Sequence, residues 1–471
     1  MSMRKMRKTG SEVLQHTLPI TLLIGLLAAA SSGCGPDEPP RPEPEPELTV
    51  EEQIAVGIEA WDIEPLPEAE PQDPAKVELG RMLFFDRILS GNLDTSCASC
   101  HHPREMTSDD IPLSAGTGAE VDGQKRRLGQ GRTWTARNST ELFNRGVSAW
   151  RTQFWDMRIR TTDDGHLLTP AGSRLPDGLD NLLAAQAMFP VTERDEMRGE
   201  RWDTDIHGEP NELGRIVDGL FNQMWSKLMV RLLENDEYRR LFAQAYPDEP
   251  VDEMGFEYAA NAIAAFEIEA FSAGPSPWDR YVAGEQGALS EPQKRGAAVF
   301  FGKGECAQCH SGTLLTDQKP YNLAVPQFGP GRDPDEPLDI GFGRVSNDPD
   351  YNFAFRTPSL RNAALTPPYM HNGAYETIEE AIRHHLDPVA SLKGYDPSHL
   401  EGDLSEMMHD DPALQERILA TLSPQMHEPP QLTDAEVDDL VAFMDALTGE
   451  GADDTIDVVP ESVPSGLPLD Q

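Results

Sequence analysis

The chain has 471 residues, with 81 acidic against 39 basic side chains and a formal net charge of −42. This excess of negative charge argues against binding to nucleic acid and favours basic partners. The length and a hydrophobic content of 38% are sufficient for more than one core, and two or three domains are predicted.

The first 34 residues have the pattern of an export signal. Basic residues near the start precede an apolar stretch at 18–30, and small residues then lead to Cys34. We therefore expect a periplasmic protein that is anchored by a lipid on Cys34. Release without a lipid and an uncleaved anchor are the alternatives. No later run of the sequence is long and apolar enough to span a bilayer.

Residues 35–73 are predicted to form a linker rich in proline and glutamate. Its first part, 36–47, cannot bury apolar surface, and its prolines keep it extended, so a tether is predicted there. A short helix is predicted at 51–60. The folded body is expected to start near Pro74.

The first domain is expected to span residues 74–285. The apolar spacing predicts a helix at 76–85, a loop at 106–132 and a long amphipathic helix at 213–233. A further helix at 256–271, rich in alanine and poor in charge, is predicted to be buried between domains.

The second domain is expected at residues 286–450, and an acidic tail follows at 451–471. A capping box of Ser290 and Gln293 opens the first helix of this domain, and a second box begins its last helix at Thr433. No alternating pattern predicts a strand of any length, so the fold class is predicted to be all-α.

Each domain contains one copy of the sequence Cys-x-x-Cys-His, which is the attachment signature of c-type haem. Thiols three positions apart lie on the same side of a helical turn, where they form thioethers, and the histidine binds the iron. The attachment residues are Cys97, Cys100, His101, Cys306, Cys309 and His310. We therefore expect two covalently bound haem c groups in two cytochrome c-type domains packed against each other. Chance and a zinc half-site are the alternatives for one copy.

Further motifs follow one another along the chain. They are Leu79-Gly-Arg-Met-Leu-Phe-Phe-Asp86, Arg137-Asn138, Phe154-Trp155-Asp156, residues 190–197, Arg356-Thr-Pro-Ser-Leu-Arg-Asn362 and Pro368-Tyr-Met-His-Asn-Gly373. In this order they resemble the bacterial dihaem cytochrome c peroxidases, a family that includes the dihaem enzyme of methylamine utilisation. The resemblance implies that the haem on His101 reacts with hydrogen peroxide. The haem on His310 would receive electrons, one at a time, from a small redox protein such as a cytochrome c or a cupredoxin.

The resemblance also assigns three residues to the chemistry. Glu196 matches the acidic residue that takes a proton from one peroxide oxygen and returns it to the other. Gln186 matches a residue that lines the same pocket, and Trp155 matches the tryptophan between the two haems. Without the resemblance, Glu196 would be interpreted as a solvated surface residue and Trp155 as part of a core.

The face of the first haem opposite His101 is predicted to be open. Typical peroxidases of the family have a removable histidine in the loop before the Arg137-Asn138 pair, but here the other histidine of that segment is His102, next to the proximal ligand. A five-coordinate first haem that needs no reductive activation is therefore expected. The alternative is that His166 supplies a distal ligand.

The second haem is expected to have His385 as its distal ligand. At this position the family peroxidases have methionine and the methylamine-utilisation enzyme has tyrosine. An imidazole in place of a thioether would lower the reduction potential. The alternatives are His384, Met370, Met407 and Met408.

The resemblance further implies a calcium site between the domains. Asn138 would provide a side-chain oxygen, and Thr366 and Pro368 would provide backbone carbonyls, which are the hard donors that Ca²⁺ prefers. Association of two copies of the chain into a homodimer is a further interaction compatible with the sequence.

Three functions are compatible with these residues. The first is a periplasmic peroxidase that reduces hydrogen peroxide with electrons from a small redox protein. The second is an oxidase that modifies a partner protein through high-valent haem, and the missing distal histidine favours it. The third is a dihaem electron carrier without turnover, which Glu196 and the open first haem argue against.

Overall fold

The computed structural model describes residues 47–122, 125–332, 336–400 and 402–470. The predicted export signal, Cys34 and most of the tether lie outside these residues. The first described helix, α1 (Val50–Ala60), begins with a capping box of Thr49 and Glu52, and the short helix predicted here is confirmed. Among the described residues, no helix has the length and apolar character needed to cross a membrane.

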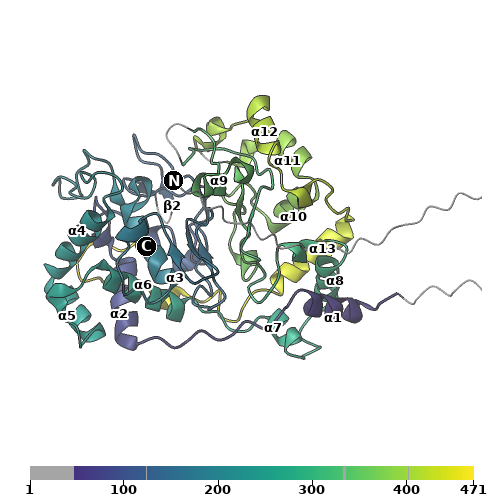
Figure 1. Ribbon diagram of the computed structural model, residues 1–471, viewed down its shortest axis with the longest axis horizontal. Coiled ribbons are helices and arrows are strands. Elements are labelled where there is room, and N and C mark those ends of the chain that lie inside the picture. The colour runs from purple at the N-terminus through teal and green to yellow at the C-terminus, as the bar shows by residue number, and fades with distance from the viewer. Residues whose placement is uncertain (1–46, 123–124, 333–335, 401, 471) are drawn as a thin grey trace, which may run out of the picture. The chain divides into compact units, whose positions relative to one another are not determined.

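Helices joined by irregular segments make up most of the described chain, and its sheets are small (Figure 1). The other helices are α2 (Pro74–Phe85), α3 (Leu182–Ala187), α4 (Phe221–Leu233), α5 (Asp236–Ala245), α6 (Phe256–Ala270), α7 (Pro277–Val282), α8 (Glu291–Phe301), α9 (Phe342–Ser346), α10 (Ile378–Leu386), α11 (Pro388–Gly394), α12 (Pro412–Leu419) and α13 (Asp434–Asp445). The mainly helical fold confirms that part of the predicted fold class.

The strands are short, and two of the three groups join neighbouring segments of the chain, whereas the third joins segments on either side of α9. The antiparallel groups are β1 (Glu120–Asp122) with β2 (Lys125–Arg127), β3 (Thr152–Gln153) with β4 (Ile159–Thr161) and β5 (Leu167–Leu168), and β6 (Pro320–Tyr321) with β7 (Phe355–Arg356). The hairpin β1–β2 lies in the segment predicted to be a loop.

The core of the first half is organised by the crossing of α2 and α6. The two helices meet at Gly80, where a Cβ atom would lie 1.8 Å from the backbone oxygen of Ala262. One turn further along each helix, the rings of Phe84 and Phe266 pack with their centroids 5.2 Å apart. A side chain at position 80 would push the helices apart, so the packing requires glycine there.

The second half repeats this arrangement with α8 and α13. A Cβ atom on Gly296 would lie 1.9 Å from the backbone oxygen of Asp439. The rings of Phe300 and Phe443 again follow one turn later, with their centroids 5.3 Å apart. Each half therefore contains one closely crossed helix pair with a glycine at the contact.

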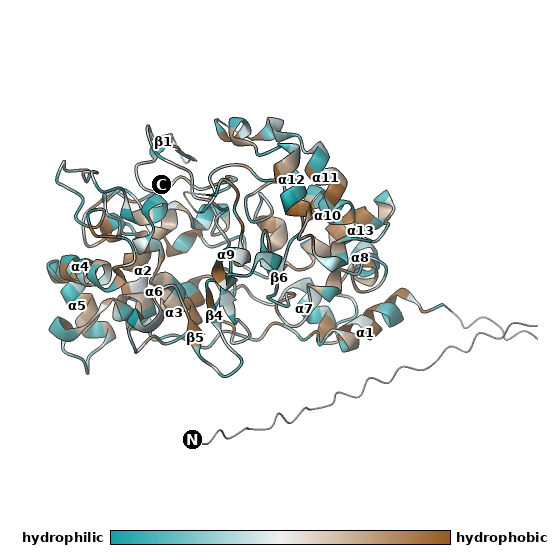
Figure 2. Cartoon of the chain, turned by 45° about the horizontal axis from the view of Figure 1, so that its top comes forward, coloured by the Kyte–Doolittle hydropathy of each residue, from teal (hydrophilic) through white to brown (hydrophobic). Residues whose placement is uncertain are grey.

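The helix predictions are confirmed in part. Ser290 and Thr433 both form the predicted capping boxes. The long helix predicted at 213–233 is wrong in its first part, since α4 begins at Phe221 and Gly219 has a φ of 77°, which an α-helix cannot contain. Hydrophobic and hydrophilic residues follow one another along α4, as expected for an amphipathic helix (Figure 2).

The position predicted for the helix at 256–271 is also wrong. Instead of lying between domains, α6 packs on α2 in the first core, where Ala262 and Phe266 are fully buried. The low charge of this helix follows from burial within one core.

Residues 451–470, predicted from the sequence to form an acidic tail, pack on the folded body. Asp470 accepts a 2.7 Å hydrogen bond from Arg87 Nη2, and the Ser465 hydroxyl donates to Asp86 Oδ1 at 2.6 Å. These contacts attach the segment to the first core.

Candidate active site and haem-binding turns

The first Cys-x-x-Cys-His sequence forms one turn of 3-10 helix, Cys97–Ser99, which starts after Ser96. Nδ1 of the following His101 lies 3.1 Å from the carbonyl oxygen of Thr107 and 3.2 Å from Oγ of Ser139. Because a carbonyl can only accept, Nδ1 carries the hydrogen and the lone pair of Nε2 is left for a metal. Burial lowers the pKa of His101 to about 4, which keeps the ring neutral, as a metal ligand must be.

The second copy folds in the same way, with the turn Cys306–Gln308 followed by His310. Nδ1 of His310 lies 3.1 Å from the carbonyl oxygen of Leu315, so Nε2 is again left for a metal. The two cysteines and the histidine line a large cavity with mostly apolar walls. Its apolar side chains from α8, α10 and α13 include Phe300, Ile378, Ile382, Leu440 and Met444. A flat, apolar macrocycle held by two thioethers fits such walls.

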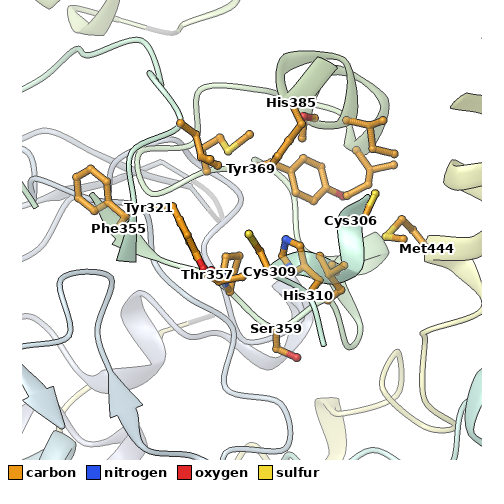
Figure 3. Close-up of a pocket in the computed structure, with 18 of the residues that line it drawn as sticks. Cys306, Cys309, His310, Tyr321, Phe355, Thr357, Ser359, Tyr369, His385 and Met444 are labelled. Carbon is orange, nitrogen blue, oxygen red and sulfur yellow. The ribbon is translucent and has the colours of Figure 1, made fainter. Parts of the chain in front are cut away.

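His385 lies on the opposite side of this cavity from His310. Figure 3 shows His385 coming from its helix on one side and Cys306, Cys309 and His310 coming from the other. Nδ1 of His385 lies 2.7 Å from the carbonyl oxygen of Ala381, one turn earlier in α10. Nε2 is therefore left available in this ring too, and it could bind the iron of a haem held by the two cysteines.

The neighbouring alternatives are less suited to this role. Both ring nitrogens of His384 are bonded, Nδ1 to the Tyr375 hydroxyl at 2.8 Å and Nε2 to the carbonyl oxygen of Leu323 at 2.8 Å. Met370 lines the cavity, whereas Met407 and Met408 are not part of its lining. The geometry therefore favours His385 over His384.

Replacing His385 by alanine should convert the second haem from low spin to high spin, because the change removes the imidazole that faces His310 across the cavity. Optical and electron paramagnetic resonance spectra of the oxidised protein measure this. The matched variant His384→Ala should leave the spin state unchanged and lower the free energy of unfolding by about 1–3 kcal/mol, since buried partners lose their hydrogen bonds. A low-spin spectrum that persists in His385→Ala would exclude His385 as the ligand.

Glu196 lies on a single turn of π-helix, Arg194–Arg198. The segment between His102 and Arg137, which contains no histidine, packs on this turn through its loop at residues 116–117. The amide of Thr117 in this loop donates to the backbone oxygen of Glu196 at 2.9 Å, and a Cβ atom on Gly116 would lie 2.0 Å from the backbone oxygen of Asp195. The glycine-containing loop is thus packed directly on the turn that carries the predicted acid–base residue.

The surroundings of Glu196 favour a protonated carboxyl group. Its side chain is 26% exposed, and Arg158 Nη2 lies 4.0 Å from Oε1. Burial and then the negative charge of Glu193 raise the pKa of Glu196 to about 8. Arg126 Nη2 donates to the backbone oxygen of Gly116 at 2.8 Å and to Oγ1 of Thr95 at 3.1 Å, so the loop packed on Glu196 is joined to the segment just before Cys97.

Trp155 contacts the surroundings of both haem turns. Its Nε1 donates to the backbone oxygen of Asn138 at 3.1 Å, and the next residue, Ser139, donates from Oγ to the backbone oxygen of Cys100 at 2.5 Å. The same indole lines the second cavity. Gln186 lies half-buried in α3, which packs against α6, β3 and β4.

The two histidines considered for the distal side of the first haem are engaged elsewhere. His166 lies between β4 and β5, with its side chain 80% exposed and Nε2 3.5 Å from Asp164 Oδ2. Nδ1 of His102 accepts a hydrogen bond from the amide of Arg104 at 3.1 Å. The exposed position of His166 supports an open distal face, and His102, whose buried Nε2 has no hydrogen-bond partner among the described residues, directly follows the proximal residue His101 in the chain.

The three residues expected to bind calcium, Asn138, Thr366 and Pro368, line the second cavity together. Nδ2 of Asn138 donates to the backbone oxygen of Ile111 at 2.9 Å, which leaves Oδ1 as the side-chain atom able to bind a cation. No group of three or more His, Cys, Asp or Glu side chains within the described ranges is arranged to hold a metal. A cation here would depend on amide and carbonyl oxygens and on water.

Sequence reasoning missed an ion network that joins the two halves of the chain. Nη1 of Arg137 lies 2.6 Å from Asp156 Oδ2, and Nε of Arg137 lies 2.6 Å from Asp339 Oδ2. Arg332 forms a further ion pair with Glu193. Arg137 and Asp156 lie in sequence motifs given above, and their opposite charges indicated that they could form an ion pair. Nothing in the sequence marked Asp339 or Arg332.

A mainly helical fold with two Cys-x-x-Cys-His turns, each presenting the Nε2 atom of a histidine, defines a c-type cytochrome with two haems. Residues 74–287 match the family model described as di-haem cytochrome c peroxidase. The match covers slightly less than half of the chain and, together with the named relatives, confirms the resemblance; the protein is an oxidoreductase of the peroxidase type.

Named relatives and solved structures agree with this assignment. The chain is 28% identical to methylamine utilization protein MauG of Methylorubrum extorquens over 84% of each chain. It is 28% identical to cytochrome c551 peroxidase of Pseudomonas aeruginosa over 68% of this chain and 75% of that one. A crystal structure of a MauG-like protein associated with microbial copper homeostasis is 26% identical, covers 83% of this chain and 96% of that one, and has a TM-score of 0.56. The diheme peroxidase BthA from Burkholderia thailandensis shares the fold, with 20% identity over 86% of this chain and 94% of that one and a TM-score of 0.54.

Proposed function

We propose that the protein is a periplasmic dihaem peroxidase that reduces hydrogen peroxide to water with electrons from a small redox protein. The family and the peroxidases among the relatives support this function. The observation that carries the proposal is the position of Glu196. It is a partly buried carboxyl group near the first haem turn, covered by a loop that brings backbone amides and no histidine.

In this proposal the haem on His101, when bound, supplies the iron at which the O–O bond breaks. Glu196 accepts a proton from one peroxide oxygen and gives it to the other, which then leaves as water. Two electrons and two further protons complete the conversion of one peroxide molecule to two waters. Arg158, 4.0 Å from the carboxyl group, stabilises Glu196 while it is ionised.

We propose Trp155 as the route of the electrons between the two haems. Its hydrogen bond to Asn138 and its place in the lining of the second cavity support this role. His101 and His310 would be the proximal ligands, His385 the distal ligand of the second haem, and Gln186 a residue of the peroxide pocket.

The proposal has further parts that concern location and ions. A lipid on Cys34 would hold the protein at the membrane, and Ca²⁺ would bind at Asn138, Thr366 and Pro368. Export fits the two Cys-x-x-Cys-His motifs, because c-type haem is attached outside the bacterial cytoplasm in the related proteins. A homodimer is compatible with this function.

Stopped-flow addition of hydrogen peroxide to the holoenzyme, with and without a reduced cytochrome c, tests the function. We expect one high-spin haem before addition, a rapid change in its absorption, and oxidation of two cytochrome molecules per peroxide. If neither a cytochrome nor a cupredoxin is oxidised, the proposal is refuted.

The reaction with peroxide should depend on pH in a defined direction. Glu196 must be a carboxylate to accept a proton, and with its pKa raised to about 8 the acid form predominates below that pH. The rate constant should therefore rise by about tenfold per pH unit and level off above a midpoint of about 8. Stopped-flow rates in a series of buffers measure this, and a flat profile would argue against Glu196 as the base.

A second candidate is the oxidation of a partner protein by the same two centres. The similarity to MauG, at 28% identity over 84% of each chain, is compatible with it, and the loop without a histidine favours it. In that case peroxide is consumed in the presence of the partner without a reduced donor, and mass spectrometry detects a covalent change in the partner. An electron carrier without turnover would not react with peroxide.

A further inference from the structure

Arg332 extends from the second half of the chain to the turn that carries Glu196. Its Nη2 atom lies 3.0 Å from Oε1 of Glu193, and its Nε atom lies 3.9 Å from Oδ2 of Asp156. The backbone oxygen of Arg332 accepts a 2.7 Å hydrogen bond from Nη1 of Arg344, which holds the residue in place. The side chains of Arg332 and Glu193 are 21% and 27% exposed, so solvent screens their ion pair only in part.

Several charged groups act on Glu196. Glu193 and Asp195 lie on or next to the same turn, and their negative charges favour its protonated form. Arg158 and Arg332 favour its carboxylate form. The loop that covers the turn contacts it through backbone atoms. After burial, the charge of Glu193 is the largest influence on the pKa of Glu196. Arg332, which neutralises Glu193, therefore lowers the pKa of Glu196.

We infer that Arg332 is a positioning residue for proton transfer: by neutralising Glu193, it increases the fraction of Glu196 that is in the carboxylate form, which accepts a proton from peroxide. This inference rests on the proposed function, in which Glu196 is the base. Arg332 lies in a loop of the half that would bind the second haem. This loop thereby influences the fraction of Glu196, beside the first haem, that is ionised and able to accept a proton.

Replacing each member of the ion pair by glutamine should move the pH profile in opposite directions. Arg332→Gln leaves the charge of Glu193 without its counterion and should raise the midpoint by roughly half a pH unit to one unit, whereas Glu193→Gln should lower it by a similar amount. The double variant should return close to the wild-type midpoint. Disruption of the structure alone would not produce shifts of opposite sign that cancel.

Two further variants separate charge from structure. Arg332→Lys keeps a positive charge at the site and should restore the midpoint to near the wild-type value. Arg417→Gln breaks a different ion pair, with Glu336 at 2.9 Å, in which the arginine side chain is 44% exposed. This control should leave the midpoint unchanged.

Two rates of the holoenzyme are measured over the same range of pH. One is the reaction with hydrogen peroxide, and the other is the binding of cyanide, because hydrogen cyanide must also lose its proton but requires no turnover. If the wild type does not react with peroxide, the proposed function fails, and the cyanide profiles decide the role of Arg332. If the wild type reacts and the glutamine variants keep its midpoint, or shift it with the same sign, the inference is overturned while the proposed function stands.

Discussion

Replacing Glu196 by glutamine should remove most of the reaction with hydrogen peroxide and leave the spectra of both haems unchanged. The rate constant is expected to fall by about 10²- to 10⁴-fold, because an amide cannot accept a proton from one oxygen and return it to the other. The remaining rate should also lose the midpoint of about 8, since the group that titrates there is gone. Stopped-flow absorption at a series of pH values measures both effects.

The matched control is Glu200→Gln. Glu200 follows the same turn, but its side chain is 60% exposed and pairs only loosely with Arg194, at 3.6 Å. Solvent screens such a group, so the rate should stay near that of the wild type. If Glu196→Gln reacts as fast as this control, another group must act as the base.

The second large effect is expected at the helix crossing of the first core. In Gly80→Ala, the new Cβ atom would lie 1.8 Å from the backbone oxygen and 2.5 Å from the carbonyl carbon of Ala262. Backbone atoms cannot turn aside as a side chain can, so α2 and α6 must separate and the aromatic core must repack. We expect the free energy of unfolding to fall by roughly 3 kcal/mol or more, as measured by urea denaturation of the holo-protein.

Gly394→Ala provides the comparison for this prediction. Gly394 is the last residue of α11, and a Cβ atom there would have no heavy atom within 4 Å. Alanine should change the stability by less than about 1 kcal/mol, and a gain is expected from the reduced freedom of the unfolded chain. Equal losses at both positions would contradict the role given to the crossing.

The sequence by itself determined the features that depend on residues close together in the chain. The capping boxes at Ser290 and Thr433 form within one helical turn, and the two Cys-x-x-Cys-His sequences each fold into a single turn. Local patterns also caused the main error in the helices. Apolar spacing continues before Phe221, but the positive φ of Gly219 interrupts the helix, and hydrophobic spacing does not report backbone conformation.

The choice between His384 and His385 shows where the sequence stopped being sufficient. Neighbouring residues on a helix point about 100° apart, so at most one of them can face the cavity. The rotation of α10 against the rest of the second half decides which one. That rotation follows from the packing of many distant side chains.

The ion pairs between the two halves of the chain were decided by the tertiary structure. Arg137 and Asp339 are 202 positions apart in the chain, and Arg332 and Glu193 come from different halves. Each of these ion pairs forms because folding brings two distant loops together, and loops have no periodicity that a sequence pattern could reveal. Charge in the sequence therefore indicated that such pairs could form, and only the packing of the two halves determined which charges meet.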